Sequence, residues 1–188
     1  MTPDQVLREV TRLLENAEIP YMVTGSFASS MLGMPRSTRD LDVVVAPESH
    51  QTPALIAAFD PEAWYIDPFV VREAVERKSM FNVVHLDSGW KVDVILRKDR
   101  PWSREEFSRR TPLLVGGTEI MFLRAEDSIL SKLDWVRQGG SLRQLEDAGT
   151  VLDVQGDAID FVYLEHWARE LGLTDLLDKI RPTSSPTT

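Results

Sequence analysis

The chain has 188 residues, of which 43% are hydrophobic, and it carries a formal net charge of −9 with a sequence pI of about 4.9. This length and composition suffice for one folded domain, or for one domain with a helical appendage. The acidic balance disfavours broad, non-specific binding to nucleic acid, which depends on clustered lysine and arginine. The sequence contains no cysteine, which excludes a disulfide framework, a thiolate metal site and a cysteine nucleophile.

The N-terminal residues predict a helix rather than a secretion signal. Thr2 can cap this helix, Pro3 suits its first turn, and the Gln5 side chain can complete a capping box with the Thr2 backbone amide. Apolar residues then recur at helical spacing as far as Ala17. Charged residues interrupt the apolar core that a signal peptide needs, and no apolar run approaches the length of a membrane span. We therefore expect a cytoplasmic protein with no membrane partner.

The segment 21–45 contains the first functional signals. A short apolar run from Tyr21 ends in Gly25-Ser26, and the small and apolar residues that follow predict a short helix that Gly33 can end. Gly25 can adopt a positive φ angle or admit a close approach of another backbone. Ser26 and the amides that follow it can then meet a phosphate at the start of the helix.

Asp40 and Asp42 begin a run of β-branched residues that predicts a strand from Leu41 to Val45. Because side chains alternate along a strand, the two carboxylates are expected on the same face. They repel each other unless a cation lies between them. Oxygen ligands of this kind suit Mg²⁺, which takes one or two carboxylates together with substrate phosphates. The alternative interpretation is an acidic pair in a solvated loop.

The middle of the chain predicts a helix over 52–59, a short strand over 64–66, a helix from about 67 to 77, and a hairpin with strands 82–86 and 90–96. Asp93 lies inside the returning strand, where an unpaired carboxylate is costly to bury. Three carboxylates on neighbouring strands can hold one or two divalent ions for in-line attack on phosphorus. This hypothesis requires Asp93 and Asp42 to face each other across adjacent strands, whereas the alternative is an aspartate exposed on its strand.

The C-terminal half changes to a helical pattern. After a charged break over 98–102, the Ser103 to Glu106 segment has a capping-box pattern, and a short hairpin follows over 113–122. Helices are then expected over 125–137, 157–171 and 174–180. A further helix is expected to begin after its N-cap residue Ser141, with Gln144 as the capping-box partner. We therefore predict a mixed-sheet α/β (α+β) core over 1–123, a helical region packed on that core over 124–180, and a disordered tail over 181–188.

Three motifs together resemble the nucleotidyltransferase superfamily of the DNA polymerase beta type. They are Gly25-Ser26, the run RSTRDLD over 36–42, and Lys91-Val92-Asp93. Among members of this superfamily, the chain is most similar to the AbiEii and MenT-like toxin nucleotidyltransferases and their bacterial relatives. The resemblance extends to about Leu152 and implies a polymerase-beta-like catalytic core.

The resemblance also implies roles for individual residues. The nucleotide-binding residues would be Gly25, Ser26, Arg36, Thr38 and Arg39. The ligands of Mg²⁺ or Mn²⁺ would be Asp40, Asp42 and Asp93. A helix lysine and a following aspartate, which lie at the active site of the toxin relatives, match Lys132 and Asp147. The alternative is that the two arginines lie on a surface loop, and that the lysine is exposed and the aspartate takes part in an inter-helix ion pair.

The reaction implied by this resemblance is Mg²⁺-dependent transfer of a nucleoside monophosphate from a nucleoside triphosphate, such as ATP, to an acceptor hydroxyl. The acceptor would be an RNA or tRNA end, a protein, or a small molecule of the antibiotic type. A toxin would also need a cognate antitoxin. Two alternatives belong to other classes: a nucleotide-binding or interaction module without catalysis, and an unrelated α/β protein whose acidic pairs arise by chance.

Overall fold

The computed structural model describes residues 1–33 and 40–181. These residues form two compact units, one holding 1–27 and 40–123 and the other holding 28–33 and 124–181. The predicted packing of 124–180 on the core stays a prediction. The nucleotide-binding candidates Arg36, Thr38 and Arg39 lie outside the described residues, as does the predicted tail beyond Arg181.

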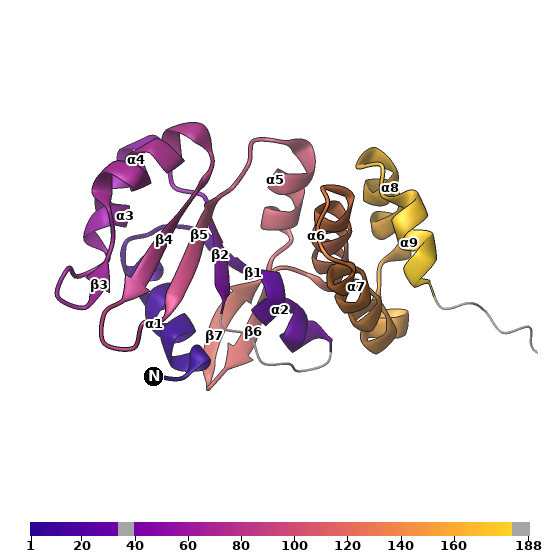
Figure 1. The fold of residues 1–188 in the computed structure, drawn as a ribbon, viewed down its shortest axis with the longest axis horizontal. Coiled ribbons are helices and arrows are strands. Elements are labelled where there is room, and N and C mark those ends of the chain that lie inside the picture. Colours follow the sequence, from indigo (N-terminus) through magenta and orange to yellow (C-terminus); the bar gives the residue numbers. More distant parts are fainter. Residues whose placement is uncertain (34–39, 182–188) are drawn as a thin grey trace, which may run out of the picture. The chain divides into compact units, whose positions relative to one another are not determined.

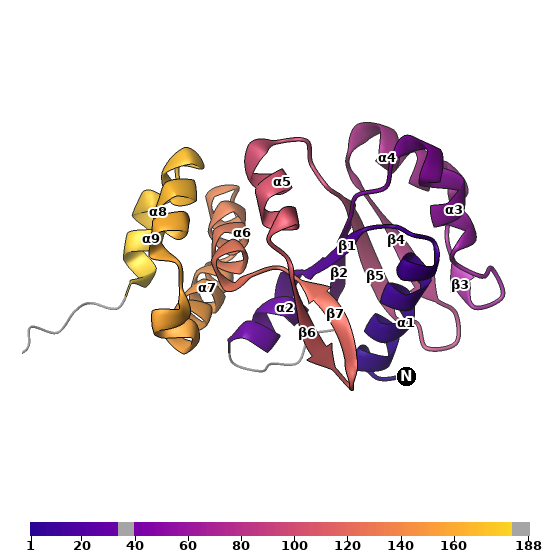
Figure 2. The same ribbon diagram turned by 180° about the vertical axis from the view of Figure 1, so that it is seen from behind.

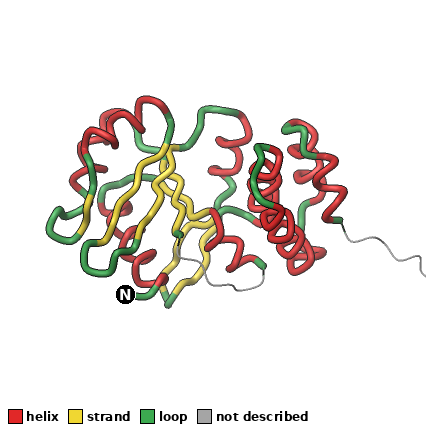
Figure 3. The backbone as a smooth tube through the Cα atoms, viewed as in Figure 1, coloured by secondary structure: helices red, strands yellow, loops and turns green. Residues whose placement is uncertain are grey.

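The first unit is built on a mixed sheet. Within the described residues the sheet has seven strands, in the order β3-β4-β5-β2-β1-β7-β6 (Figures 1 and 3). The strands are β1 (Tyr21–Thr24), β2 (Leu41–Val45), β3 (Trp64–Tyr65), β4 (Met80–His85), β5 (Lys91–Leu96), β6 (Thr111–Val115) and β7 (Thr118–Phe122). β2 runs parallel to β5 and β1 runs parallel to β7, whereas the other neighbours are antiparallel. The predicted mixed-sheet α/β fold is confirmed.

Burial alternates along the central strands and gives the sheet two different faces. On one face the side chains are buried: Leu41, Val43, Val45, Val92, Val94, Leu96, Phe81 and Val83. The residues between them are half-buried or exposed, and they include Asp42, Asp93 and Asn82. Alternation of this kind follows from the two-residue period of a strand. The polar candidates therefore share the more open face of the sheet.

The helices of the first unit contribute the rest of its core. They are α1 (Pro3–Asn16), α3 (Thr52–Ala57), α4 (Pro68–Arg77) and α5 (Pro101–Ser108), and both views show α3 and α4 along the β3–β4 edge of the sheet (Figures 1 and 2). α1 begins as predicted, because Thr2 Oγ1 accepts from the Gln5 amide at 3.3 Å while Gln5 Oε1 accepts from the Thr2 amide at 2.7 Å. No helix in the described part of the chain has the length and apolarity needed to cross a membrane.

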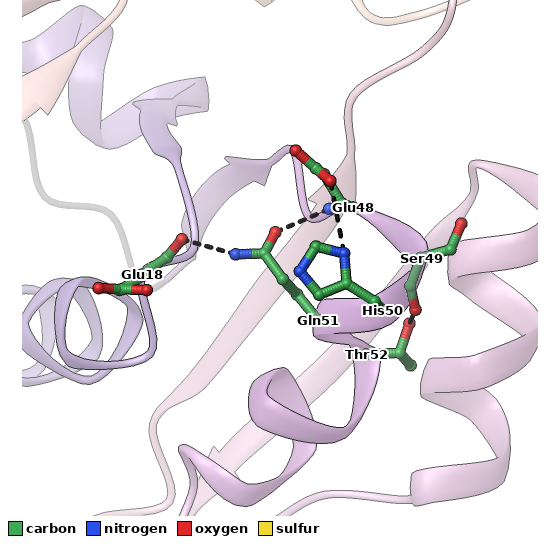
Figure 4. A network of polar contacts seen from close by, with 6 residues as sticks. All are labelled: Glu18, Glu48, Ser49, His50, Gln51 and Thr52. Carbon is green, nitrogen blue, oxygen red and sulfur yellow. Dashed lines mark hydrogen bonds and ion pairs between the residues drawn. The ribbon is translucent and has the colours of Figure 1, made fainter.

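A polar network joins the loop after β2 to the loop before β1 (Figure 4). The Gln51 side chain donates to the carbonyl of Glu18 at 3.0 Å and accepts from the Glu48 amide at 2.8 Å. The Ala46 amide also donates to the carbonyl of Pro20 at 2.9 Å. These contacts tie the two strands together where Tyr21 pairs with Val45, at the end remote from Asp42.

The second unit is helical. Its elements are the end of α2 (Gly25–Leu32), α6 (Ala125–Arg137), α7 (Leu142–Gln155), the 3₁₀ turn η2 (Gly156–Ala158), α8 (Phe161–Glu170) and α9 (Thr174–Ile180). The Gln155 side chain donates to the carbonyl of Leu32 at 2.5 Å. A Cβ atom added to Gly33 would lie 3.3 Å from Cγ2 of Val151. The end of α2 therefore packs directly against α7.

Two predicted helix starts are wrong. α5 begins at Pro101 rather than at Ser103, because proline suits the first turn of a helix; the Ser103 hydroxyl accepts from Nε of Arg100 at 2.9 Å instead of capping. The helix expected from residue 157 begins at Phe161, where the side chain of Asp160 caps it by accepting from the Tyr163 amide at 3.0 Å. The first difference follows from the proline and the second from the Asp160 cap.

Candidate functional site

A row of polar residues crosses the central strands of the sheet. The register pairs Thr24 with Asp42 between β1 and β2, Asp42 with Asp93 between β2 and β5, and Asp93 with Asn82 between β5 and β4. Residues in register on neighbouring strands point to the same face. The two aspartates therefore lie next to each other across a parallel strand pair, as the sequence-based hypothesis required.

Gly25, the first residue of α2, lies against the carboxyl group of Asp42. A Cβ atom added to Gly25 would lie 2.6 Å from Cγ and 2.9 Å from Cβ of Asp42, both closer than real Cβ contacts come. Gly25 also has a φ angle of +69°, which other L residues adopt only with strain. Both the space and the backbone angle require glycine here. The absence of a side chain brings the start of α2 directly beside Asp42.

Asp93 is bound by two side chains from the same sheet face. The carboxylate has no hydrogen to donate, so Asn82 presents its amide nitrogen to Oδ1 across the β4–β5 pair. The Lys91 ammonium lies 3.1 Å from Oδ1 and 3.4 Å from Oδ2 of Asp93. The Asp93 side chain is 16% exposed and that of Lys91 is 47% exposed. Asp93 is therefore a partly buried carboxylate that already has a cationic partner.

The charges of the site act together on Lys91. The hydrogen bond to Asp93 raises the pKa of the Lys91 ammonium above its ordinary value, partial burial opposes this, and the negative charges of Asp93, Asp40 and Asp42 raise the pKa further. All three candidate carboxylates are thus close enough to stabilise one positive charge. A cation at this end of the sheet is favoured electrostatically.

Asp40 takes part in a pocket beside this row. The pocket has a volume of about 450 Å³, and besides Asp40 it is lined by Ser88, Gly89, Trp90 and Lys91 from the β4–β5 turn. The indole nitrogen of Trp90 donates to the carbonyl of Met1 at 3.1 Å, which fixes the ring. Small-molecule pockets in proteins have volumes of about 300–1,000 Å³. The pocket is therefore large enough for an organic ligand next to the aspartates.

The aspartates fit a hard divalent cation by chemistry, although they are not a preformed cage. Within residues 1–33 and 40–181, the structure has no group of three or more His, Cys, Asp or Glu side chains that could hold one metal ion. Mg²⁺ needs only one or two carboxylates when substrate phosphates supply its other ligands. The in-register pair of Asp42 and Asp93 meets that requirement with oxygen ligands alone. Binding through Asp93 would involve an oxygen that Lys91 now contacts.

Lys132 and Asp147 lie in the second unit and bind each other. The Lys132 ammonium is 3.1 Å from Oδ2 of Asp147 and donates to Oε1 of Gln144 at 3.0 Å. The ion pair between α6 and α7 is the one that the alternative interpretation expected. The side chains of Lys132 and Asp147 are 6% and 15% exposed, so the lysine is not exposed as that interpretation expected. The catalytic role of Lys132 and Asp147 stays a prediction.

Ser141 is the N-cap residue of α7, but its side chain makes no cap hydrogen bond, so the predicted capping box is wrong.

The sequence interpretation did not assign roles to Asn82 and Lys91. Lys91 stands two residues before Asp93 in a strand, so the two side chains share a face. Counting back through the turn over 87–89 places Asn82 opposite Asp93. Both partners could therefore have been found from the hairpin register.

Only the comparison with solved structures finds similar proteins, and these bear on the fold. Neither a protein-family model nor a curated protein matches the chain. Among solved structures, an antigenic nucleotidyltransferase-like protein from Paracoccidioides brasiliensis has a TM-score of 0.55 at 16% identity, over 93% of this chain and 91% of that chain. The antibiotic-resistance factor ANT(2'')-Ia has a TM-score of 0.54 at 11% identity, over 94% and 96% of the two chains. Its complex with adenylyl-2''-tobramycin has a TM-score of 0.54 at 13% identity, over 92% and 98%. At these identities the likeness establishes a nucleotidyltransferase-like fold, and the relation to the AbiEii and MenT-like toxins stays a prediction.

Proposed function

We propose that this protein is a metal-dependent nucleotidyltransferase, which transfers a nucleoside monophosphate from a nucleoside triphosphate to an acceptor hydroxyl. The observation that supports this most is the in-register pair of Asp42 and Asp93 on adjacent parallel strands. Gly25 beside Asp42 supports it further, because its missing side chain keeps the start of α2 next to that carboxylate. The fold shared with nucleotidyltransferase-like structures is consistent with this function.

In this mechanism, Asp40, Asp42 and Asp93 would hold Mg²⁺ or Mn²⁺, which when bound would neutralise charge on the triphosphate. Gly25 and Ser26, with the amides that begin α2, would bind the triphosphate tail. The acceptor hydroxyl oxygen forms a bond to the α-phosphorus while the bond to pyrophosphate breaks. If Asp93 does not bind the second ion, it would instead take the hydroxyl proton as a general base. In either role its partly buried carboxylate would be kept in place by Asn82.

Two observations bear on which acceptor the protein uses. The resemblance to toxin nucleotidyltransferases points to an RNA or tRNA end, or a protein hydroxyl, with a cognate antitoxin as partner. The solved complex of ANT(2'')-Ia with adenylyl-2''-tobramycin favours a small molecule of the antibiotic type as the second candidate. The pocket of about 450 Å³ beside Asp40 has room for such a molecule. The net charge of −9 weighs against a long nucleic-acid duplex in either case.

The rival to both is a module that binds nucleotide without catalysis. A module that had lost its chemistry would be free to lose its carboxylates, and the presence of Asp40, Asp42 and Asp93 argues against that history. The distinction is experimental, because binding and transfer are measured separately. A binding module would retain Mg²⁺-dependent nucleotide affinity and would transfer no label.

The test is label transfer from each α-labelled nucleoside triphosphate with Mg²⁺, to total RNA, to cell extract and to a panel of aminoglycosides. We expect label on one acceptor class with the wild-type protein, and a loss of at least about 100-fold in the Asp42→Asn variant, because ligand removal acts on transition-state charge. Asp87→Asn is the matched control, since Asp87 is an exposed carboxylate in the β4–β5 turn. Equal transfer by the wild type and Asp42→Asn would refute the proposal.

A further inference from the structure

We propose that Lys91 is the resident cation of the site: its ammonium holds Asp93 when no metal is bound, and a divalent ion must displace that ammonium in order to bind. Asn82 is then a positioning residue, which keeps the Asp93 carboxylate in place whichever cation is present. This inference rests on the proposed function, because it concerns the same carboxylates, and it concerns how the site gains its metal.

The first argument for this role comes from the contacts of Lys91. Its ammonium lies 3.1 Å from one Asp93 oxygen and 3.4 Å from the other, so it interacts with the whole carboxylate. Metal ligation would use the same oxygens, and the positive charge of the ammonium would repel a divalent ion bound beside it. Residues two positions apart in a strand have their side chains on the same face, so β5 keeps Lys91 and Asp93 on one face of the sheet. Lysine and metal therefore compete for one group.

The second argument comes from the negative charges of the neighbouring aspartates. Asp42 and Asp93 are in register on neighbouring strands, which lie about 4.8 Å apart. Two carboxylates at such a spacing repel each other unless a cation compensates them. Lys91 supplies that compensation in the protein itself, and Asp40 and Asp42 act on its ammonium as well as Asp93. The ion pair therefore compensates the Asp93 carboxylate beside Asp42.

Asn82 should have the opposite effect to Lys91 on metal binding. Its amide donates to Oδ1 of Asp93 from the neighbouring strand β4, and the register places the two residues directly opposite each other. An amide is neutral, so it adds no charge that would exclude a divalent ion. It leaves the other lone pairs of the carboxylate available, because one oxygen accepts more than one bond. Removing the amide should therefore weaken metal binding, whereas removing the ammonium should strengthen it.

The test is direct Mn²⁺ binding, measured by the electron paramagnetic resonance of free Mn²⁺ without nucleotide or acceptor. We expect Lys91→Met to bind Mn²⁺ about two- to fivefold more tightly, which corresponds to the loss of one half-exposed ion pair. Lys91→Arg keeps the pair and should stay near the wild-type affinity. Asn82→Ala should bind about two- to fivefold more weakly. Lys98→Met removes an exposed lysine beyond the end of β5 and should have no effect.

Each outcome decides the inference. Unchanged or weaker Mn²⁺ binding in Lys91→Met overturns it, and so does the absence of any bound Mn²⁺ in both wild type and Lys91→Met. Circular dichroism checks the fold of each variant, and Lys91→Gln is the second variant should the methionine variant not fold. Asp42→Asn identifies the site, since it should abolish the tight component. If label transfer fails while the opposite shifts of Lys91→Met and Asn82→Ala are found, the enzymatic proposal fails and this inference stands.

Discussion

Gly25→Ala is expected to be among the most disruptive single-methyl additions in the first unit. The new Cβ atom would lie 2.6 Å from Cγ and 2.9 Å from Cβ of Asp42, and the backbone would have to hold a φ angle of +69° with a side chain present. The backbone term alone is about 1–2 kcal/mol for an L residue other than glycine. Relieving the collision requires Asp42 or α2 to move, which adds about 1–3 kcal/mol by the usual cost of overpacking.

Gly89→Ala is the matched control, because Gly89 has a φ angle of +68° but a Cβ atom there would meet nothing within 4 Å. We expect the free energy of unfolding to fall by about 1–2 kcal/mol in Gly89→Ala and by about 2–5 kcal/mol in Gly25→Ala. For a protein of this size the fall expected for Gly25→Ala corresponds to a fall in Tm of roughly 4–20 °C. The difference between the two variants isolates the contact with Asp42.

The assay is urea unfolding followed by circular dichroism, with label transfer measured on the same preparations. Gly25→Ala should also lose transfer, since it displaces Asp42, whereas Gly89→Ala should lose much less. In an Asp42→Ala background the cost of Gly25→Ala should shrink, because the carboxyl group is gone. Equal stability losses in Gly25→Ala and Gly89→Ala would refute the argument that Gly25 is required by its contact with Asp42.

Two further predictions concern buried polar groups. Lys132→Met should lower the free energy of unfolding by about 3 kcal/mol, because it removes the ammonium from a largely buried ion pair with Asp147. Lys179→Met, at an exposed lysine of α9, should cost less than about 0.5 kcal/mol in the same urea titration. Burial, and then the hydrogen bond that Tyr21 donates to Glu15 at 2.6 Å, raise the pKa of the Tyr21 phenol. The unfolded chain therefore loses this proton first, so stability should fall as the pH rises above about 10. Tyr21→Phe should flatten that fall and cost about 1 kcal/mol at neutral pH; an unchanged slope would contradict the assignment.

Several elements that the sequence predicted correctly have a local signal. The capping residues of α1, the alternating valines around Asp93 and the turn over 87–89 each depend on residues a few positions apart. Such patterns reflect backbone geometry, which is set by neighbours along the chain. The parallel pairing of β2 with β5 has no local signal, because these strands are joined by a long crossover. The sequence analysis required Asp42 and Asp93 on adjacent strands, because carboxylates on neighbouring strands can share a metal ion, but it did not predict that these strands are parallel.

Local reasoning failed where a side chain had two competing partners. Gln144 stands at the right spacing to complete a capping box with Ser141, yet its side-chain oxygen accepts from Lys132 instead. A buried ammonium needs acceptors more than an exposed helix end needs a second cap, because water can satisfy the latter. The burial of Lys132 depends on how α6 packs against α7, which the spacing of residues does not reveal. The partners of buried charges are thus the part of the structure that the sequence predicts least well.

The same reasoning bears on whether the fold depends on metal. The Asp93 side chain is only 16% exposed, so an uncompensated carboxylate there would destabilise the strand. Lys91 and Asn82 compensate it, so the wild-type sheet should fold without a divalent ion. In Lys91→Met that support is lost and a bound metal must replace it. Chelation by EDTA should therefore lower the Tm of Lys91→Met by several degrees relative to a Mn²⁺-saturated sample, and that of the wild type by less. A ligand stabilises the folded state by RT ln(1 + [L]/Kd), which is larger for the variant that binds more tightly. An equal effect of chelation on both proteins would mean that the ammonium of Lys91 does not take the place of the metal.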